Sequence, residues 1–105
     1  MKKSTPWGVS QGHETLAAGI EFHYTASHGG IVLDDKHKAK MEQFRYSNFR
    51  NWARCWEEDC DWAVPYYYFR DEIKKAGNLN DKMLDAAIKT IKDWHKGVAE
   101  QLAIT

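Results

Sequence analysis

The 105-residue sequence lacks several features that mark particular classes of protein. No segment approaches about eighteen consecutive apolar residues, so the sequence predicts no membrane span. The basic opening, Met1–Lys3, is followed by no apolar stretch, which argues against a signal peptide. The formal net charge is zero, so the chain lacks the overall positive charge on which most nucleic-acid binders rely. We therefore expect a cytoplasmic protein that has no membrane partner.

Cysteine is also scarce, since Cys55 and Cys60 are the only two. On a helix, a separation of five residues places two side chains about 140° apart, because each residue turns the helix by about 100°. That arrangement suits neither a disulfide nor a shared metal ion. We expect both side chains to be reduced thiols, with Cys60 in the core, and we expect no metal ion and no other cofactor.

The composition is otherwise that of a globular protein, with 43% hydrophobic and 29% charged residues. A chain of this length forms one core, so we expect a single domain over residues 1–105. The charge is unevenly distributed along the sequence. Residues 1–54 carry eight Lys/Arg and five Asp/Glu, whereas residues 55–105 carry seven Lys/Arg and ten Asp/Glu. Five Trp and five Tyr are many for this size, and such side chains serve both cores and binding surfaces.

The least ordinary stretch is Thr25–Gly30, with the sequence TASHGG. A strand-like alternation over Ile20–Ala26 leads into it, and the short apolar run Ile31–Leu33 follows. Small polar residues and two glycines between such runs are typical of a tight turn between antiparallel strands. We expect Gly29 and Gly30 to adopt positive φ angles and to leave their N–H groups exposed.

The β region is predicted to extend from residue 6 to residue 33, after a loose tail over residues 1–5. Pro6-Trp7-Gly8 is typical of a turn with a buried anchor. A possible extended segment at Thr15–Ala17 supplies a third strand, since a two-stranded hairpin alone is marginally stable in water.

Residues 34–105 are predicted to be mainly helical. Asp34 is a suitable N-cap for a short surface helix over Lys36–Tyr46. The polar segment 47–51 predicts a loop in which Phe49 and the following Trp52 anchor the chain to the core.

The acidic segment Trp56–Val64 has four carboxylates within five positions. The N-terminal turn of a helix stabilises such charge, so we expect a helix from Glu57 to Lys75, ending before Gly77. Pro65 lies inside this span and indicates either a kink or a later start.

The last predicted helix begins after the N-cap residue Asn80, and Gly97 is its weak point. Its apolar positions recur at steps of three and four residues and predict one buried stripe: Leu84, Ile88, Ile91, Trp94, Val98 and Leu102. The expected fold is therefore α+β, with a small antiparallel sheet of about three strands packed against about three helices.

Three motifs together resemble a family of domains of unknown function from bacterial phages, plasmids and other mobile elements. They are TPWG at Thr5–Gly8, TASHGG at Thr25–Gly30 and EEDCDWA at Glu57–Ala63, and the resemblance covers about residues 5 to 70. It implies a protein of the bacterial host cytoplasm and an accessory role, such as binding and blocking a host defence protein. It supplies no catalytic residues.

We expect the second and third motifs to meet in space, with His28 paired to an acidic side chain such as Asp59 or Asp61. The candidate binding residues are His28, Gly29, Gly30, Asp59, Asp61 and Trp62. The preferred interpretation of this pairing is a structural latch that fixes the hairpin to the helix, and a binding role for these residues is the alternative.

Two further function classes remain open. The first is a small metal-dependent hydrolase that would use His23 and His28 with a carboxylate of Glu58, Asp59 or Asp61. The second is a nucleic-acid-associated factor that would use basic residues of the first half and aromatic stacking residues: Lys36, Lys38, Lys40, Arg45, Arg50, Arg54, Tyr46 and Trp52. Such basic charges also suit a solvated surface. The oligomeric state is left open.

Overall fold

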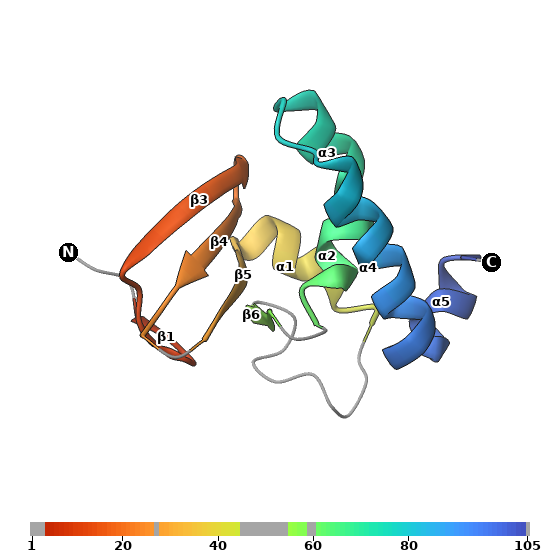
Figure 1. Ribbon diagram of the computed structural model, residues 1–105, viewed down its shortest axis with the longest axis horizontal. Helices are drawn as coiled ribbons and strands as arrows, with labels where there is room; N and C mark the ends of the chain where they lie inside the picture. The colour runs from red at the N-terminus through yellow and green to blue at the C-terminus, as the bar shows by residue number, and fades with distance from the viewer. Residues whose placement is uncertain (1–3, 27, 45–54, 59–60, 105) are drawn as a thin grey trace.

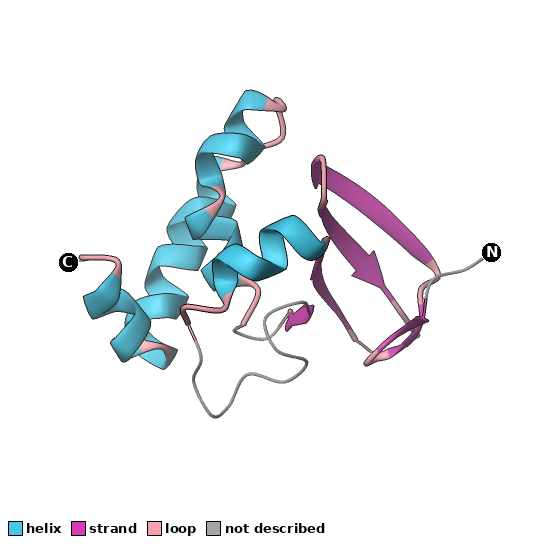
Figure 2. Cartoon of the chain, turned by 180° about the vertical axis from the view of Figure 1, so that it is seen from behind, coloured by secondary structure: helices cyan, strands magenta, loops and turns pink. Residues whose placement is uncertain are grey.

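A computed structural model describes residues 4–26, 28–44, 55–58 and 61–104. An antiparallel sheet lies at the N-terminal end of the molecule, and the helices of the second half lie together at the other end (Figures 1 and 2). The fold is α+β, as the sequence predicts.

The main sheet has four antiparallel strands in the order β3-β4-β5-β6. The first three are β3 (Gly12–Ala17), β4 (Ile20–Tyr24) and β5 (Gly29–Leu33), which confirms the three strands that the sequence predicts. The fourth, β6 (Cys55–Glu57), pairs with the far edge of β5. It occupies a position at which the sequence predicted the beginning of a helix.

A small hairpin precedes the main sheet. Its strands are β1 (Ser4–Thr5) and β2 (Gly8–Val9), so residues 4 and 5 are paired rather than part of a loose tail. Pro6 and Trp7 form the turn between them, as expected. The hydroxyl of Thr5 donates to the carbonyl oxygen of Gly8 at 2.7 Å and closes this turn.

Helix α1 (Asp35–Met41) begins as predicted and ends earlier than predicted. The N-cap is Asp34, whose Oδ1 accepts a hydrogen bond from the backbone N–H of His37 at 2.9 Å. The expected anchors Phe49 and Trp52 lie outside the described residues.

The predicted helix over residues 57–75 is wrong in its first part. The segment instead contains β6, and then α2 (Ala63–Tyr68) and α3 (Arg70–Lys75). Pro65 lies in the first turn of α2, where a backbone N–H would have no partner within the helix, so it marks the later start. Phe69, with φ −100° and ψ 20°, separates the two helices.

The last predicted helix is divided into α4 (Asp81–Trp94) and α5 (Lys96–Gln101). Its N-cap is Asn80, as expected, whose side chain accepts from the N–H of Met83 at 3.0 Å. The break falls at His95 rather than at Gly97.

The predicted apolar stripe is wrong at Trp94, whose side chain is 71% exposed. After Ile91, the next buried residue is His95, four positions later, and not Trp94, three positions later. His95 is buried, and its Nε2 lies 3.5 Å from Oδ1 of Asp61.

The core fills the space between the sheet and the helices. Its fully buried side chains come from both parts: Ile20, Ile31, Leu33, Trp56, Ala63, Val64, Ile73, Ala87, Ile91 and Val98. Among the described residues, no helix has the length and apolar character needed to cross a membrane.

Candidate functional site

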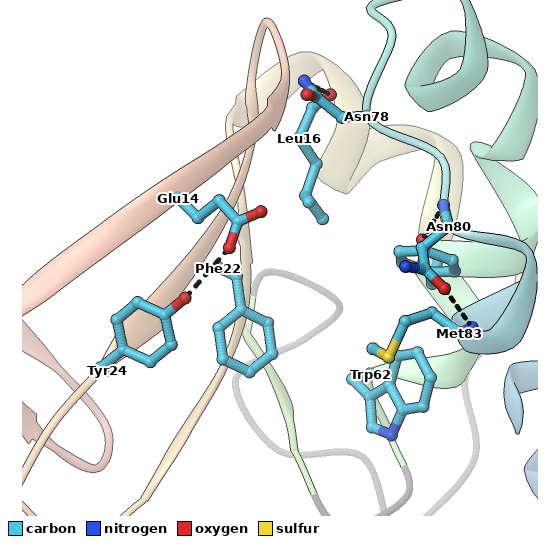
Figure 3. Close-up of a pocket in the computed structure, with 9 residues that line it drawn as sticks. Glu14, Leu16, Phe22, Tyr24, Trp62, Asn78, Asn80 and Met83 are labelled. Atoms are coloured by element: carbon cyan, nitrogen blue, oxygen red, sulfur yellow. Dashed lines mark hydrogen bonds between the residues drawn. The ribbon is translucent and has the colours of Figure 1, made fainter.

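A cleft with aromatic walls opens between the sheet and the helices (Figure 3). We call it the aromatic cleft. Its volume is about 260 Å³. Nine residues line it: Glu14, Leu16, Phe22, Tyr24, Trp62, Tyr66, Asn78, Asn80 and Met83.

Strands β3 and β4 supply one wall of the aromatic cleft. Because alternate residues of a strand point to the same face, Phe22 and Tyr24 share this face on β4, and Glu14 of β3 is paired with Phe22. Leu16, at the register shift between Thr15 and Ala17, also lines the cleft. The rings of Phe22 and Tyr24 lie 5.3 Å apart and are tilted by 53°. The sheet thus presents two adjacent rings and a carboxylate to the cleft.

The hydroxyl of Tyr24 donates a hydrogen bond to Oε2 of Glu14 at 3.1 Å. Partial burial of the ring, this hydrogen bond and the negative charge of Glu14 together raise the pKa of Tyr24 above its usual value. The phenol therefore stays protonated at neutral pH and continues to orient the Glu14 carboxylate.

The helices supply the opposite wall. Trp62 is the N-cap residue of α2 and Tyr66 lies one turn later, so the two rings stack edge to face with their centres 5.5 Å apart. Met83 of α4 adds a thioether beside Trp62 (Figure 3). Trp62 is 8% exposed and forms the base of this wall, whereas Met83 is 41% exposed at its rim.

The segment between α3 and α4 ties the two walls together. Asn78 Nδ2 donates to the carbonyl oxygens of Thr15 and Leu16 at 3.2 and 3.0 Å. The hydroxyl of Tyr66 accepts from the backbone N–H of Asn80 at 3.1 Å. These bonds join β3 and α2 to the start of α4, so the width of the aromatic cleft is set by the fold.

The motif residues meet elsewhere, at a second feature that we call the motif corner: Trp7, His28, Gly29, Gly30 and Glu57. Nδ1 of His28 lies 3.9 Å from Oε1 of Glu57. The predicted meeting of the second and third motifs is therefore confirmed, and Glu57 is the acidic side chain involved. Both side chains are largely solvent-accessible, at 51% and 36%.

The predicted conformation of Gly29 and Gly30 is wrong. Neither has a positive φ. Both are buried strand residues, paired with Tyr24 and His23 of β4. The hairpin reverses before Gly29 instead, where the N–H of Thr25 donates to the carbonyl oxygen of His28 at 2.8 Å.

Gly30 is required for close packing rather than for turning. A Cβ atom at this position would lie 2.3 Å from the carbonyl oxygen of Trp56 and 2.7 Å from Cη2 of Trp7. Trp7 belongs to the first motif and Gly30 to the second, and β6 leads into the third. The three motifs thus share one tightly packed corner.

The six candidate binding residues are divided between several places. His28, Gly29 and Gly30 lie in the motif corner, and Trp62 lies in the aromatic cleft. Asp61 reaches the buried His95. Asp59 lies outside the described residues, as do Cys60 and the predicted stacking residues Tyr46 and Trp52. Cys55 is a partly buried residue of β6.

Two histidine networks could not be predicted from the sequence, because their members are far apart along the chain or form no recognisable motif. In the first, Nδ1 of buried His23 lies 2.7 Å from the hydroxyl of Ser10, and its Nε2 lies 2.9 Å from Oε1 of Glu21. These are the residue types of a serine-hydrolase triad, but Ser10 is only 5% exposed. The network therefore fixes the segment before β3 onto β4.

In the second network, His37 bridges two carboxylates. Its Nδ1 lies 2.7 Å from Oδ1 of Asp34, and its Nε2 lies 2.7 Å from Oε2 of Glu72. Hydrogen bonds from the backbone N–H and the ring of His37 hold the pKa of Asp34 below its usual value. This bridge joins α1 to α3.

The alternative of a metal-dependent hydrolase requires three clustered ligands. Within the described part of the chain, no group of three or more His, Cys, Asp or Glu side chains has the arrangement of a metal site. His23 is engaged with Ser10 and Glu21, and His28 lies at the motif corner.

Residues 1–103 match a family described as a domain of unknown function, DUF7007. No curated protein and no solved structure matches the chain.

Proposed function

Since the chain belongs to the DUF7007 family, a family of unknown function, we propose from its geometry that it is a protein-binding protein whose aromatic cleft receives a side chain of its partner. The observation that carries this proposal is an open cleft between the sheet and the helices, lined by four aromatic side chains.

The size of the cleft favours a single side chain over a larger molecule. Its volume of about 260 Å³ lies below the roughly 300–1,000 Å³ that is usual for small-molecule sites. Protein interfaces concentrate their binding energy where one anchoring residue fills a well-packed pocket. Tyr, Trp, Phe and Met are also the residue types enriched at such interfaces.

A more specific part of the same proposal concerns the biological setting of the protein. The resemblance of the three motifs to domains of phages and plasmids supports an accessory protein of a mobile element. In that setting the partner is a protein of the bacterial host, such as a defence component, which the bound protein blocks.

A comparison of two alanine variants tests the proposal. Immobilised protein is used to capture binding partners from a lysate of the bacterium that carries the gene, and the captured protein is then purified and its affinity measured. Tyr24→Ala removes a half-exposed ring from the cleft, so we expect affinity to fall at least tenfold. Trp94→Ala removes a more exposed ring elsewhere and serves as the control.

Each variant is first checked for an unchanged circular dichroism spectrum. Equal affinity of the wild type and Tyr24→Ala for the captured partner would contradict the proposal. Capture of nucleic acid in place of protein would contradict it as well.

A further inference from the structure

We propose that the partner residue received by the aromatic cleft is an arginine. This inference rests on the proposed function and specifies the chemistry of its ligand. It follows from the charge of the cleft, the orientation of its one carboxylate and the rings beside that carboxylate.

The first argument is charge. Among the nine described lining residues, Glu14 alone carries a formal charge at neutral pH. No Lys, Arg or His is part of this set, so a cation that enters the cleft meets a carboxylate and no lining cation. An anionic side chain would meet Glu14 and be repelled.

The second argument is the orientation of Glu14. Its Oε2 accepts the hydrogen bond from Tyr24, which fixes the position of the carboxylate over the sheet wall. Glu14 is an exposed residue, so its carboxylate is accessible to a ligand. A fixed carboxylate with an available oxygen is well suited to a planar guanidinium group, which presents several N–H donors in a rigid arrangement.

The third argument is the pair of rings beside that carboxylate. Phe22 and Tyr24 lie next to Glu14 on the same face of the sheet (Figure 3). A guanidinium stacks on an aromatic face while it donates from its edge, whereas an ammonium is a compact and strongly hydrated point charge. The chain uses this contact itself, since the guanidinium of Arg70 lies 4.1 Å from the centre of the Tyr67 ring.

The test uses capped five-residue peptides that differ only in the central residue: arginine, lysine, citrulline or norleucine. Binding is followed at millimolar peptide concentration by nuclear magnetic resonance, through the indole N–H of Trp62 and the backbone amides of β3 and β4. Citrulline keeps the planar shape of arginine without its charge. We expect the arginine peptide to bind about tenfold more tightly than the citrulline peptide.

Two matched variants locate the effect. Glu14→Gln keeps the shape of the side chain and its hydrogen bond from Tyr24, and we expect it to remove the preference for arginine over citrulline. Glu100→Gln makes the same change of charge on an exposed residue of α5, and we expect it to leave the preference intact.

Equal binding of norleucine and arginine would overturn the inference and identify an apolar anchor pocket. Equal binding of lysine would overturn the assignment to a guanidinium group. Absence of any shift at the cleft would overturn it too. In each case the proposed function is judged separately, by the effect of Tyr24→Ala on the captured partner.

Discussion

The motif corner and the aromatic cleft use aromatic side chains in opposite ways. At the motif corner, Trp7 covers Gly30 so closely that even a Cβ atom has no room. In the aromatic cleft, Phe22 and Trp62 face an open volume of about 260 Å³. The corner brings together residues of the three unusual motifs, and the cleft presents aromatic side chains to an open volume.

This difference shows why a distinctive motif is not by itself a binding site. A sequence becomes unusual wherever few residue types are tolerated, and close backbone packing restricts the choice as strongly as ligand binding does. At the corner, close packing accounts for Gly30. In the cleft, Trp62 and Tyr66 belong to the buried core, whereas Tyr24 and Met83 expose apolar surface that a bound partner would cover.

Gly30→Ala is expected to have the largest effect. The added methyl group meets the backbone of β6, which cannot rotate away as a flexible side chain could. We expect the free energy of unfolding to fall by about 2–3 kcal/mol, the upper part of the usual range for overpacking. Chemical denaturation measures this change.

Gly12→Ala is the matched control. Gly12 also lies in a strand, but a Cβ atom there would be 3.8 Å from the nearest atom, which is ordinary contact. We expect this variant to be as stable as the wild type or more stable, by up to about 1 kcal/mol. Equal losses in both variants would show that the corner is not specially packed.

Asp34→Asn is expected to have an intermediate effect that depends on pH. The pKa of Asp34 is lowered in the folded protein relative to its ordinary value of 3.8. The ionised carboxylate therefore stabilises the fold above pH 3.8, and this contribution is lost as the pH falls through the lower, folded-state value. Because the side chain is 49% exposed, solvent screening limits the contribution to about 1 kcal/mol or less.

The measurement is the difference in unfolding free energy between the wild type and Asp34→Asn as a function of pH. Asparagine still caps α1, so the variant isolates the charge. The wild type should be the more stable protein near neutral pH, and the difference should shrink below pH 3.8. A difference that grows on acidification would refute this account of the bridge through His37.

His28→Ala is expected to have the smallest effect on stability. If His28 were a latch for a buried or half-buried carboxylate, as the sequence suggested, His28→Ala would leave that carboxylate without its partner and cost about 1–3 kcal/mol. The structure places His28 and Glu57 3.9 Å apart, and both are substantially exposed. Surface pairs of this kind contribute little, so we expect a change within about 0.5 kcal/mol, measured by thermal unfolding.

The features that the sequence predicted well depend on neighbouring residues. The alternation along Ile20–Tyr24 identified β4, and Asp34 and Asn80 identified the starts of two helices. Capping and alternation are local effects, so they are visible before the chain folds. The resulting prediction covered most of the fold.

The features that were missed depend on contacts between distant segments. A strand as short as Cys55–Glu57 shows no periodicity, and it forms because the edge of β5 is available to it. The aromatic cleft combines β3, β4, α2 and the start of α4. Of its lining residues only Trp62 was a candidate, because no sequence pattern shows that Glu14 and Tyr24 would face it.

The central claim is that binding depends on the aromatic cleft and not on the motif corner. The most direct test is to measure the affinity of one purified partner for wild type, Tyr24→Ala and His28→Ala side by side, with each variant shown to be folded. We predict that Tyr24→Ala loses at least tenfold in affinity and that His28→Ala binds as the wild type does. Lost binding in His28→Ala together with retained binding in Tyr24→Ala would contradict the claim.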